Sequence, residues 1–495
     1  MSSPPSPVPV PGSGEALRAR YGARYRWLLL ATVMVGVMAS IMSSTVVNVA
    51  IPALSHQFGL GQERAQWVTS GFMVASTVSM LLTPWLLARF GYRATFNGCM
   101  GLLLAGGLLG GFAQNYALVL VARVAEGLAA GVVQPIPAII IMRAFEPHEQ
   151  GRASGLFGMG LVLAPALGPS VGGLLVDAFG WRSIFFMVAP FCAVCLWMAR
   201  RYVPTTGPGG AAASRAESLD WIGLTVGTVG TLSLLNGLVA LRSGPPLQAA
   251  LLLALAAACL VVFIAWQRRL ARRGQAPLMN LALFAWRPFA MGALVALIYG
   301  TALFGSTYLL PVYMQMGLGL SASLVGSILL PSGLVLALAI PLAARAADRQ
   351  PASGLVSMGL SLLALSFAAM VTIGLQSSLW LLMALTVIGR IGLGFILPSL
   401  NLGAMRGLDK ALIPQGSSTI NFVRMLGGAA GVSLCGILLE WRLAAHGTSL
   451  TDGPPSAARL AAFDDVFLML AALCGLAMLA ARHLNQPVPP PERIA

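Results

Sequence analysis

Charged residues are scarce in this chain of 495 residues. They make up only 9% of it, hydrophobic residues make up 57%, and soluble globular proteins carry roughly 25% charge. The stretches 94–122, 288–344 and 350–389 contain no Asp, Glu, Lys or Arg at all. About 20 apolar residues are enough to span a bilayer as a helix. The composition therefore excludes an ordinary soluble protein and predicts an all-α integral membrane protein with the lipid bilayer as its solvent.

Residues that could hold a metal ion or carry redox chemistry are also few. The 4 histidines are scattered along the chain, and the 6 cysteines all lie inside apolar stretches. Cys192 and Cys195 form a Cys-x-x-Cys pair with no second pair, and free cysteine is commonly a small buried hydrophobic residue. We therefore expect neither a metal site nor a cofactor.

The net charge of +15 could suggest a nucleic-acid partner. Nucleic-acid-binding proteins gather such charge on a soluble face or tail. In this sequence the basic residues fall in short loops between apolar segments, and that pattern reports membrane topology instead. We expect no nucleic-acid partner.

Fourteen apolar segments are long enough to be membrane spans. Most of the 30 Lys and Arg residues fall in alternate loops between them, including clusters at 18–26 and 268–273. Because basic residues collect on the cytoplasmic side, the N- and C-termini are both predicted to be cytoplasmic. The expected spans are 27–49, 67–87, 95–114, 116–138, 153–176, 182–199, 221–241, 247–266, 288–310, 323–344, 354–374, 378–400, 417–439 and 463–481.

The first six and the last six spans contain a weak internal repeat. Arg123 opens the sequence Arg-Val-Ala-Glu-Gly and Arg390 opens Arg-Ile-Gly-Leu-Gly, each early in the fourth span of its group. Many secondary carriers are built from such repeats, with the substrate site between them. The predicted domains are a disordered cytoplasmic tail (1–26), an N-terminal six-helix bundle (27–200), a linker with two inserted spans (201–287), a C-terminal six-helix bundle (288–482) and a cytoplasmic tail (483–495).

Short motifs follow one another in a fixed order along nearly the whole chain. They include Ser-Ser-Thr-Val-Val-Asn-Val-Ala-Ile-Pro at 43–52, Gln-Trp-Val at 66–68, the loop 84–93, the glycine-rich stretch 123–135, Ala-Pro-Ala-Leu-Gly-Pro-Ser-Val-Gly-Gly at 164–173, Trp-Arg at 181–182, Asp-Trp-Ile-Gly at 220–223, Leu-Pro-Val-Tyr-Met-Gln at 310–315, Asp-Arg at 348–349 and Gly-Ser-Ser at 416–418. Together they resemble the fourteen-span drug:proton antiporters of the major facilitator superfamily (EmrB/QacA type). The resemblance implies the major facilitator fold, with two six-helix bundles plus two inserted helices.

The chain also departs from the pattern of that family. Ser43 stands where the first span usually carries an Asp, Ala88 replaces the Asp of the loop after the second span, and Glu126 stands where the fourth span usually has Gln. These departures concern proton coupling and leave the predicted fold unchanged.

Four charged residues, Arg123, Glu126, Arg390 and Arg424, are expected inside spans. A charge at the bilayer centre costs about 2.5–3.5 kcal/mol, so these side chains are expected to face the protein interior or a wet cavity. Arg123 and Glu126 are three residues apart and therefore share a helix face. Two interpretations stay open: a structural ion pair, or a proton-coupling pair in which Glu126 replaces the missing first-span acid. Burial disfavours the charged carboxylate and the neighbouring arginine favours it.

A second group of residues is expected to serve conformational change. Glycines remove side chains so that another helix can approach closely, and prolines bend a helix. The resemblance implies this role for Arg89, Gly91, Arg93, Pro165, Gly168, Pro169, Gly172, Gly173, Asp348 and Arg349. Ordinary small-residue packing is the alternative explanation of these glycines.

Polar and aromatic residues in the spans are candidates for lining a substrate cavity. For Arg390 and Arg424 a structural role and a contact with an anionic substrate both stay open. The full set of candidates is Asn48, Trp67, Gln134, Tyr299, Tyr308, Gln315, Arg390, Asn401, Asn421 and Arg424.

The predicted function is export of small hydrophobic or amphipathic compounds across the cell inner membrane by proton-coupled alternating access. The resemblance also implies a periplasmic membrane-fusion adaptor as partner. One alternative is an uncoupled or specific metabolite exporter of the same fold, which the residues Ser43 and Ala88 favour. Another is a non-transporting membrane sensor, although the short loops leave no room for an output module. No nucleophile–base pair points to an enzyme.

Overall fold

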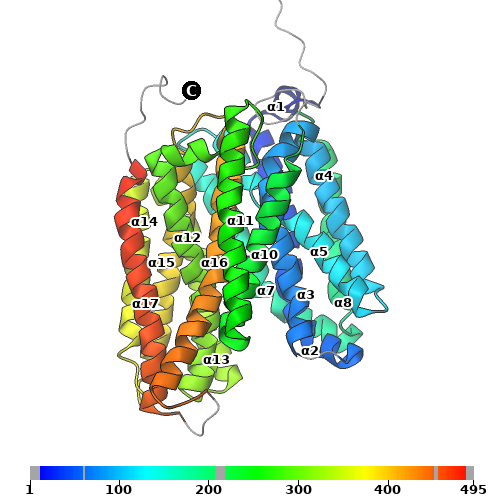
Figure 1. Cartoon of the computed structure of the whole chain (residues 1–495). Coiled ribbons are helices and arrows are strands. Elements are labelled where there is room, and N and C mark those ends of the chain that lie inside the picture. Colours follow the sequence, from blue (N-terminus) through cyan, green and yellow to red (C-terminus); the bar gives the residue numbers. More distant parts are fainter. Residues whose placement is uncertain (1–11, 60–61, 207–217, 451–454, 486–495) are drawn as a thin grey trace, which may run out of the picture. The chain divides into compact units, whose positions relative to one another are not determined.

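The computed structural model describes residues 12–59, 62–206, 218–450 and 455–485, without the side chains of 52, 62–66, 162–170, 242–243 and 322–323. The described residues form helices joined by short connections and contain no strand (Figure 1). Helices satisfy all of their backbone hydrogen bonds internally, as apolar surroundings require. The prediction of an all-α protein is confirmed.

Among the described residues, 12 helical stretches are long and apolar enough to cross a membrane. One of them, Trp67–Gly111, has 45 residues, about twice the length that a single span needs. It is interrupted at Gly91, whose φ of 76° and ψ of 173° are not helical. Helix α7 (Gln150–Phe179) has 30 residues and lies outside these 12 stretches. The chain is a multi-pass membrane protein.

The chain divides into two compact units, and the first comprises residues 1–146, 163–219 and 409–415. Helix α5 is its central element because it packs against α2, α3 and α4, while α9 packs against α2 and α4. The helices of this unit are α1 (Gly14–Tyr21), α2 (Tyr25–Phe58), α3 (Gln62–Ser79), α4 (Thr83–Gly111), α5 (Tyr116–Val133), α6 (Ile136–Ala144), the second part of α7, α8 (Ser183–Phe186) and α9 (Val188–Tyr202).

The second unit comprises residues 147–162, 220–408 and 416–495. Helix α15 packs against α12, α13 and α14, and α17 packs against α12 and α14. The helices are α10 (Trp221–Ser243), α11 (Pro246–Arg272), the short η3 (Leu281–Ala285), α12 (Arg287–Val312) with the π-helical turn η4 (Tyr313–Gly317), α13 (Ala322–Ala347), α14 (Ala352–Met370), α15 (Leu379–Met405), α16 (Ile413–Ala445), α17 (Ala457–Ala481) and η5 (Arg482–Asn485).

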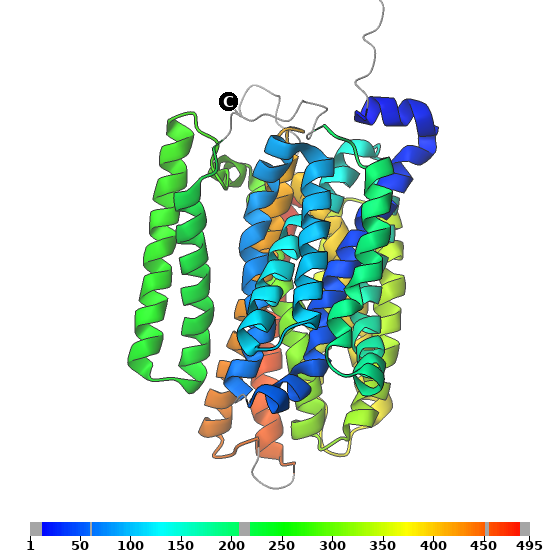
Figure 2. The same ribbon diagram turned by 90° about the vertical axis from the view of Figure 1, so that its right-hand side faces the viewer.

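Helices α10 and α11 form a hairpin and lie side by side (Figure 2). They are the least buried of the candidate spans, with only 22% and 17% of their apolar windows buried. A buried carboxylate holds the base of the hairpin. Asp220 accepts hydrogen bonds from the backbone N–H of Gly223 at 2.8 Å, the indole N–H of Trp266 at 2.8 Å and the amide of Gln267 at 2.7 Å. The Asp-Trp-Ile-Gly motif therefore marks the start of this hairpin.

Candidate functional site

A fully buried ion pair joins Arg123 and Glu126 in α5. The helix begins after Asn115, whose side-chain oxygen accepts a hydrogen bond from the N–H of Leu118 at 2.9 Å. The Arg123 Nη1 atom lies 2.5 Å from Glu126 Oε2, and each side chain is 1% exposed. The spacing of three residues places both groups on one face of α5, as the sequence predicts.

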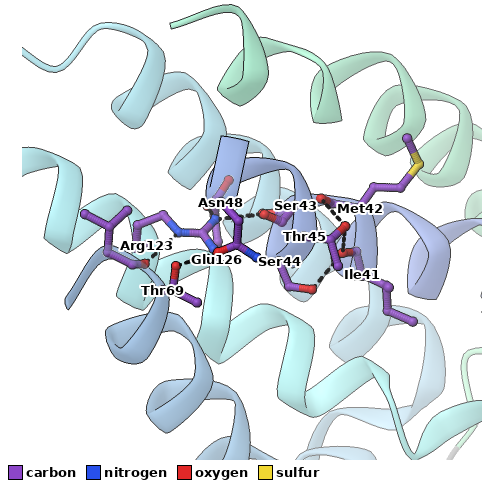
Figure 3. A network of polar contacts seen from close by, with 10 residues as sticks. Ile41, Met42, Ser43, Ser44, Thr45, Asn48, Thr69, Arg123 and Glu126 are labelled. Atoms are coloured by element: carbon purple, nitrogen blue, oxygen red, sulfur yellow. Dashed lines mark hydrogen bonds and ion pairs between the residues drawn. The ribbon is translucent and has the colours of Figure 1, made fainter. Parts of the chain in front are cut away.

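Arg123 connects three helices of the first unit (Figure 3). Its Nη1 donates to the hydroxyl of Ser43 at 3.1 Å and to the carbonyl of Ser43 at 3.2 Å, both in α2. Its Nε donates to the carbonyl of Val68 in α3 at 3.1 Å, and the guanidinium lies 4.4 Å from the centre of the Phe72 ring. Carbonyl acceptors and an aromatic face both stabilise a buried guanidinium.

Glycines allow the neighbouring helices to reach this pair. A methyl group on Gly127 would lie 2.4 Å from the carbonyl oxygen of Phe72, so α3 can approach α5 this closely only at a glycine. In α4, a methyl group on Gly106 would lie 2.8 Å from Glu126 Cγ. The glycine-rich character of the stretch 123–135 therefore serves to bring α3 against α5 around the charged groups.

Two atoms of the pair are buried without a hydrogen-bond partner in the described part of the chain: Arg123 Nη2 and Glu126 Oε1. A buried ion pair pays a large desolvation cost, and an unsatisfied polar atom adds to it. A proton on Glu126 would remove the negative charge and weaken the bond to Arg123. The geometry is therefore suited to two arrangements, one with the ion pair formed and one with Glu126 protonated.

The substrate-cavity candidates of the first unit are Asn48, Trp67 and Gln134. Asn48 is exposed and accepts a hydrogen bond from Thr69 at 2.8 Å, one residue along α3 from Val68 (Figure 3). Trp67 is 39% exposed, and Gln134 is partly exposed at the end of α5. The structure thus brings Asn48 next to the charged pair, while the aromatic ring of Trp67 stays accessible.

In the second unit three of the predicted residues lie on helices that pack together: Tyr299 on α12, Arg390 on α15 and Arg424 on α16. Arg390 and Arg424 both interact electrostatically with the hydroxyl group of Tyr299. Arg424 also donates to the side-chain oxygen of Asn421 at 3.0 Å. In the described part of the chain, no hydrogen bond connects these residues to the remaining candidates of this unit, Tyr308, Gln315 and Asn401.

The loop residues 89–93 pack against residues 203–206 of the same unit. Arg93 donates through Nε to the carbonyl of Val203 at 2.7 Å, and Arg89 lies over the ring of Trp85 at 5.5 Å. A methyl group on Gly91 would lie 2.3 Å from the carbonyl oxygen of Thr205. With its φ of 76°, Gly91 meets two demands that only glycine satisfies, close approach and a left-handed backbone.

Asp348, at the end of α13, caps the beginning of α7. Its carboxylate accepts hydrogen bonds from the N–H groups of Gly151 at 2.7 Å and Arg152 at 3.2 Å. Burial raises the pKa of Asp348, and the two N–H groups oppose that rise. The positive end of the α7 dipole also stabilises a negative charge at this position. Arg349 is exposed.

The glycines of the motif at 164–173 can be placed only in part. Gly172 faces α2, since a methyl group there would lie 2.6 Å from Val46 Cγ1, and Gly173 lies near Val49. The predicted residues Pro165, Gly168 and Pro169 lie outside the described side chains. Close packing of α7 on α2 at Gly172 agrees with small-residue packing.

Residues 33–432 match the family model of the Major Facilitator Superfamily. The chain belongs to this superfamily. It is 30% identical over 444 residues to a multidrug resistance protein B homolog of Mycobacterium tuberculosis, a match that covers 88% of this chain and 81% of the relative. It is also 30% identical over 471 residues to a probable actinorhodin transporter of Streptomyces coelicolor, with 92% and 80% covered.

Solved structures of superfamily members share the fold. The human organic anion transporter MFSD10 has a TM-score of 0.64 at 17% identity, with 92% of this chain and 99% of that chain covered. The proton:xylose symporter XylE has a TM-score of 0.66 at 12% identity, with 93% and 95% covered. The superfamily member described here is a membrane transporter, and it is not an enzyme.

Three partners of Arg123 were not predicted from the sequence as such. Ser43 stands out only as a departure from the family pattern, and Val68 and Phe72 are not among the candidate residues. Their spacing of four places Val68 and Phe72 on one face of α3. Every residue has a backbone carbonyl, however, so the residue type does not identify Val68 as an acceptor. Only the packing of α3 against α5 reveals the contact.

Proposed function

We propose that this major facilitator superfamily transporter exports small hydrophobic or amphipathic compounds by proton-coupled alternating access. Relatives of the chain include a multidrug resistance protein B homolog, a probable actinorhodin transporter and, at 23% identity, a lincomycin resistance protein of Listeria monocytogenes. The buried pair of Arg123 and Glu126 carries the proposal of proton coupling, because a carboxylate with almost no solvent exposure and one strong partner can exchange its ion pair for a proton.

In the proposed cycle Glu126 takes over from the acid that Ser43 replaces. Ser43 still contacts Arg123, so this guanidinium is held between the first and fourth spans as the expected site would require. Protonation of Glu126 loosens Arg123 from α5 and leaves it with the acceptors of α2 and α3. A proton that binds one conformation better than the other shifts the balance between inward- and outward-facing forms.

Export by the wild-type protein is expected to depend on the proton gradient. Everted membrane vesicles that contain the protein should accumulate a fluorescent amphipathic dye when they are energised, and a protonophore should reduce this accumulation to the level of vesicles without the protein. Accumulation that persists with the protonophore would favour the uncoupled exporter or facilitator. Absence of any dye or drug movement across a broad panel would contradict the export function.

We also propose fourteen spans with both termini cytoplasmic, in the inner membrane, with bundles 27–200 and 288–482 and two inserted spans in the linker 201–287. The break at Gly91 supports two spans within Trp67–Gly111, and the 30-residue helix α7 supports a further one. Periplasmic export would then suit a membrane-fusion adaptor as partner. The candidate residues Asn48 and Trp67 of the first unit, and Tyr299, Asn421 and Arg424 of the second, are proposed to contact the transported compound.

Reporter fusions test this topology. Truncation at Arg273, after the arginine cluster that ends α11, is expected to give fluorescence with a green fluorescent reporter, because this reporter matures in the cytoplasm. Truncation at Gly447, after α16, is expected to give activity with a periplasmic phosphatase reporter. Each site with the other reporter serves as its control. Phosphatase activity at Arg273 would reject the arrangement.

A further inference from the structure

The second unit carries two arginines, Arg390 and Arg424, within its predicted spans, and no carboxylate of the described residues interacts with either one. Arg424 is 7% exposed, its Nε is buried without a hydrogen-bond partner among the described residues, and its Nη2 bonds only to the neutral amide of Asn421. Arg390 is partly exposed and forms no hydrogen bond or ion pair within the described part of the chain. Among the described residues, the Tyr299 hydroxyl interacts electrostatically with both.

In the first unit the buried arginine, Arg123, has a carboxylate partner in the same helix. Arg123 and Arg390 occupy matching places in the internal repeat, but the residue three positions later differs. Arg123 is followed by Glu126, which pairs with it, whereas Arg390 is followed by Leu393, which is 2% exposed. The second unit therefore has a leucine where the first has Glu126, and its helix α16 carries a further arginine, Arg424.

Close helix packing holds these groups together. A methyl group on Gly300, next to Tyr299, would lie 2.0 Å from the carbonyl oxygen of Arg424. The hydroxyl of Thr301 donates to the carbonyl of Gly427 at 2.9 Å and adds a second contact between α12 and α16. The backbone at Arg424 is thus held against α12, next to the residue that follows Tyr299.

Two guanidiniums inside a membrane-spanning unit need an anionic partner. A buried charge without a counter-charge is costly, and no described carboxylate interacts with either arginine. We propose that Arg390, Arg424 and Tyr299 form a binding site for an anionic group, a carboxylate or sulfonate, of the transported compound. This inference rests on the proposed export function and narrows its substrate class to amphipathic organic anions.

The chemistry of the three side chains fits such a group. Guanidiniums donate paired, charge-assisted hydrogen bonds to the planar oxygens of an acid. The hydroxyl of Tyr299, which is 4% exposed, can donate a third. The apolar remainder of the ligand would lie against the mostly aliphatic spans.

Binding of matched probes to the purified full-length protein tests the site. The probes are naphthalene-2-sulfonate with its neutral sulfonamide, and naphthalene-2-carboxylate with its neutral carboxamide. Each acid is expected to bind about tenfold more tightly than its neutral isostere, as the loss of a charge-assisted hydrogen bond implies. In Arg390→Gln and in Arg424→Gln this preference should fall to nearly one, whereas Arg345→Gln, at an exposed arginine of the same unit, should keep it.

A second pair of variants leaves both arginines in place. Leu393→Glu puts a carboxylate three residues after Arg390, as Glu126 is placed after Arg123, and should remove most of the preference for the acids. Leu393→Gln introduces a side chain with nearly the same shape as Glu but no charge, so this variant should keep the preference for the acids. Melting temperatures of all variants show whether they fold.

Equal affinities of the acids and their isosteres for the wild-type protein would overturn the inference, and so would a preference that both arginine variants retain. Inorganic sulfate that competes as strongly as the naphthalene acids would show a site for a simple counter-ion and would also overturn it. None of these results bears on energy-dependent export, which the vesicle assay measures separately. Loss of export with intact discrimination in binding would instead reject the proposed function alone.

Discussion

Replacement of Glu126 by Gln is expected to abolish proton-driven export, with dye accumulation in energised vesicles reduced to background. Gln cannot take up a proton, yet its amide oxygen can still accept the hydrogen bond that Arg123 Nη1 donates to Glu126 in the wild-type protein. The remaining partners of Arg123, Ser43 and the carbonyl of Val68, are untouched. The variant therefore removes the titration and keeps the network, so it should be produced and folded at close to normal levels.

Exchange of substrate in the absence of a gradient distinguishes this effect from misfolding. Glu126→Gln imitates the protonated state and should still exchange labelled for unlabelled substrate, because that exchange requires no net movement of protons. Asp177→Asn, at an exposed acid near the end of α7, is the matched control and should export normally. Protonophore-sensitive export by Glu126→Gln at the wild-type rate would show that Glu126 does not carry the proton.

Replacement of Arg123 instead of Glu126 would leave the Glu126 carboxylate buried without its ion-pair partner. A buried carboxylate that loses its only ion-pair partner costs about 3–5 kcal/mol if it stays charged, and a proton can neutralise it. In the proposed cycle the two groups therefore have different roles: the Glu126 carboxylate changes its protonation state, and the Arg123 guanidinium, which also bonds to α2 and α3, transmits the change. The hydroxyl of Ser43 accepts a hydrogen bond from Arg123, and unlike the acid that it replaces it does not take up a proton in this pH range.

The fold and the superfamily could be predicted because long apolar stretches and short motifs can be recognised directly in the sequence. Charge-free stretches such as 94–122 permit only a helical span, and the ordered motifs match a superfamily that the comparisons confirm. The pairing of Arg123 with Glu126 was also predictable, since a spacing of three within one helix fixes it. The number of spans was harder to test, because the backbone break at Gly91 lies within a single long apolar stretch.

Contacts between distant helices could not be predicted in the same way. Asn48 and Tyr299 were both selected as polar or aromatic residues in spans, yet Asn48 pairs with Thr69 on the next helix and Tyr299 lies beside two arginines. Gln315 was selected on the same ground and is exposed in η4. Side-chain type gives the capacity for a contact, but the depth and rotation of each helix decide whether it forms.

Gly300→Ala is expected to damage the second unit severely although it adds one methyl group. The added carbon would lie 2.0 Å from the carbonyl oxygen of Arg424 and 3.0 Å from the backbone nitrogen of Gly428, so backbone atoms of α16 would have to move. Overpacking of this kind costs about 1–3 kcal/mol and sometimes more. A decrease of about 5 °C or more in the apparent melting temperature of the purified protein should follow.

The same substitution should also weaken ligand binding, because it forces Arg424 away from Tyr299. Gly326→Ala is the matched control, since nothing outside its chain neighbours and the backbone of its own helix lies within 4 Å of the position that its methyl group would occupy. It should leave the melting temperature and the affinity for naphthalene-2-sulfonate unchanged. If Gly300→Ala melts and binds like Gly326→Ala, the approach of α12 to α16 is looser than the structure has it. The close packing of the Arg424 backbone on Gly300, which supports the anion site, would then lose its physical basis.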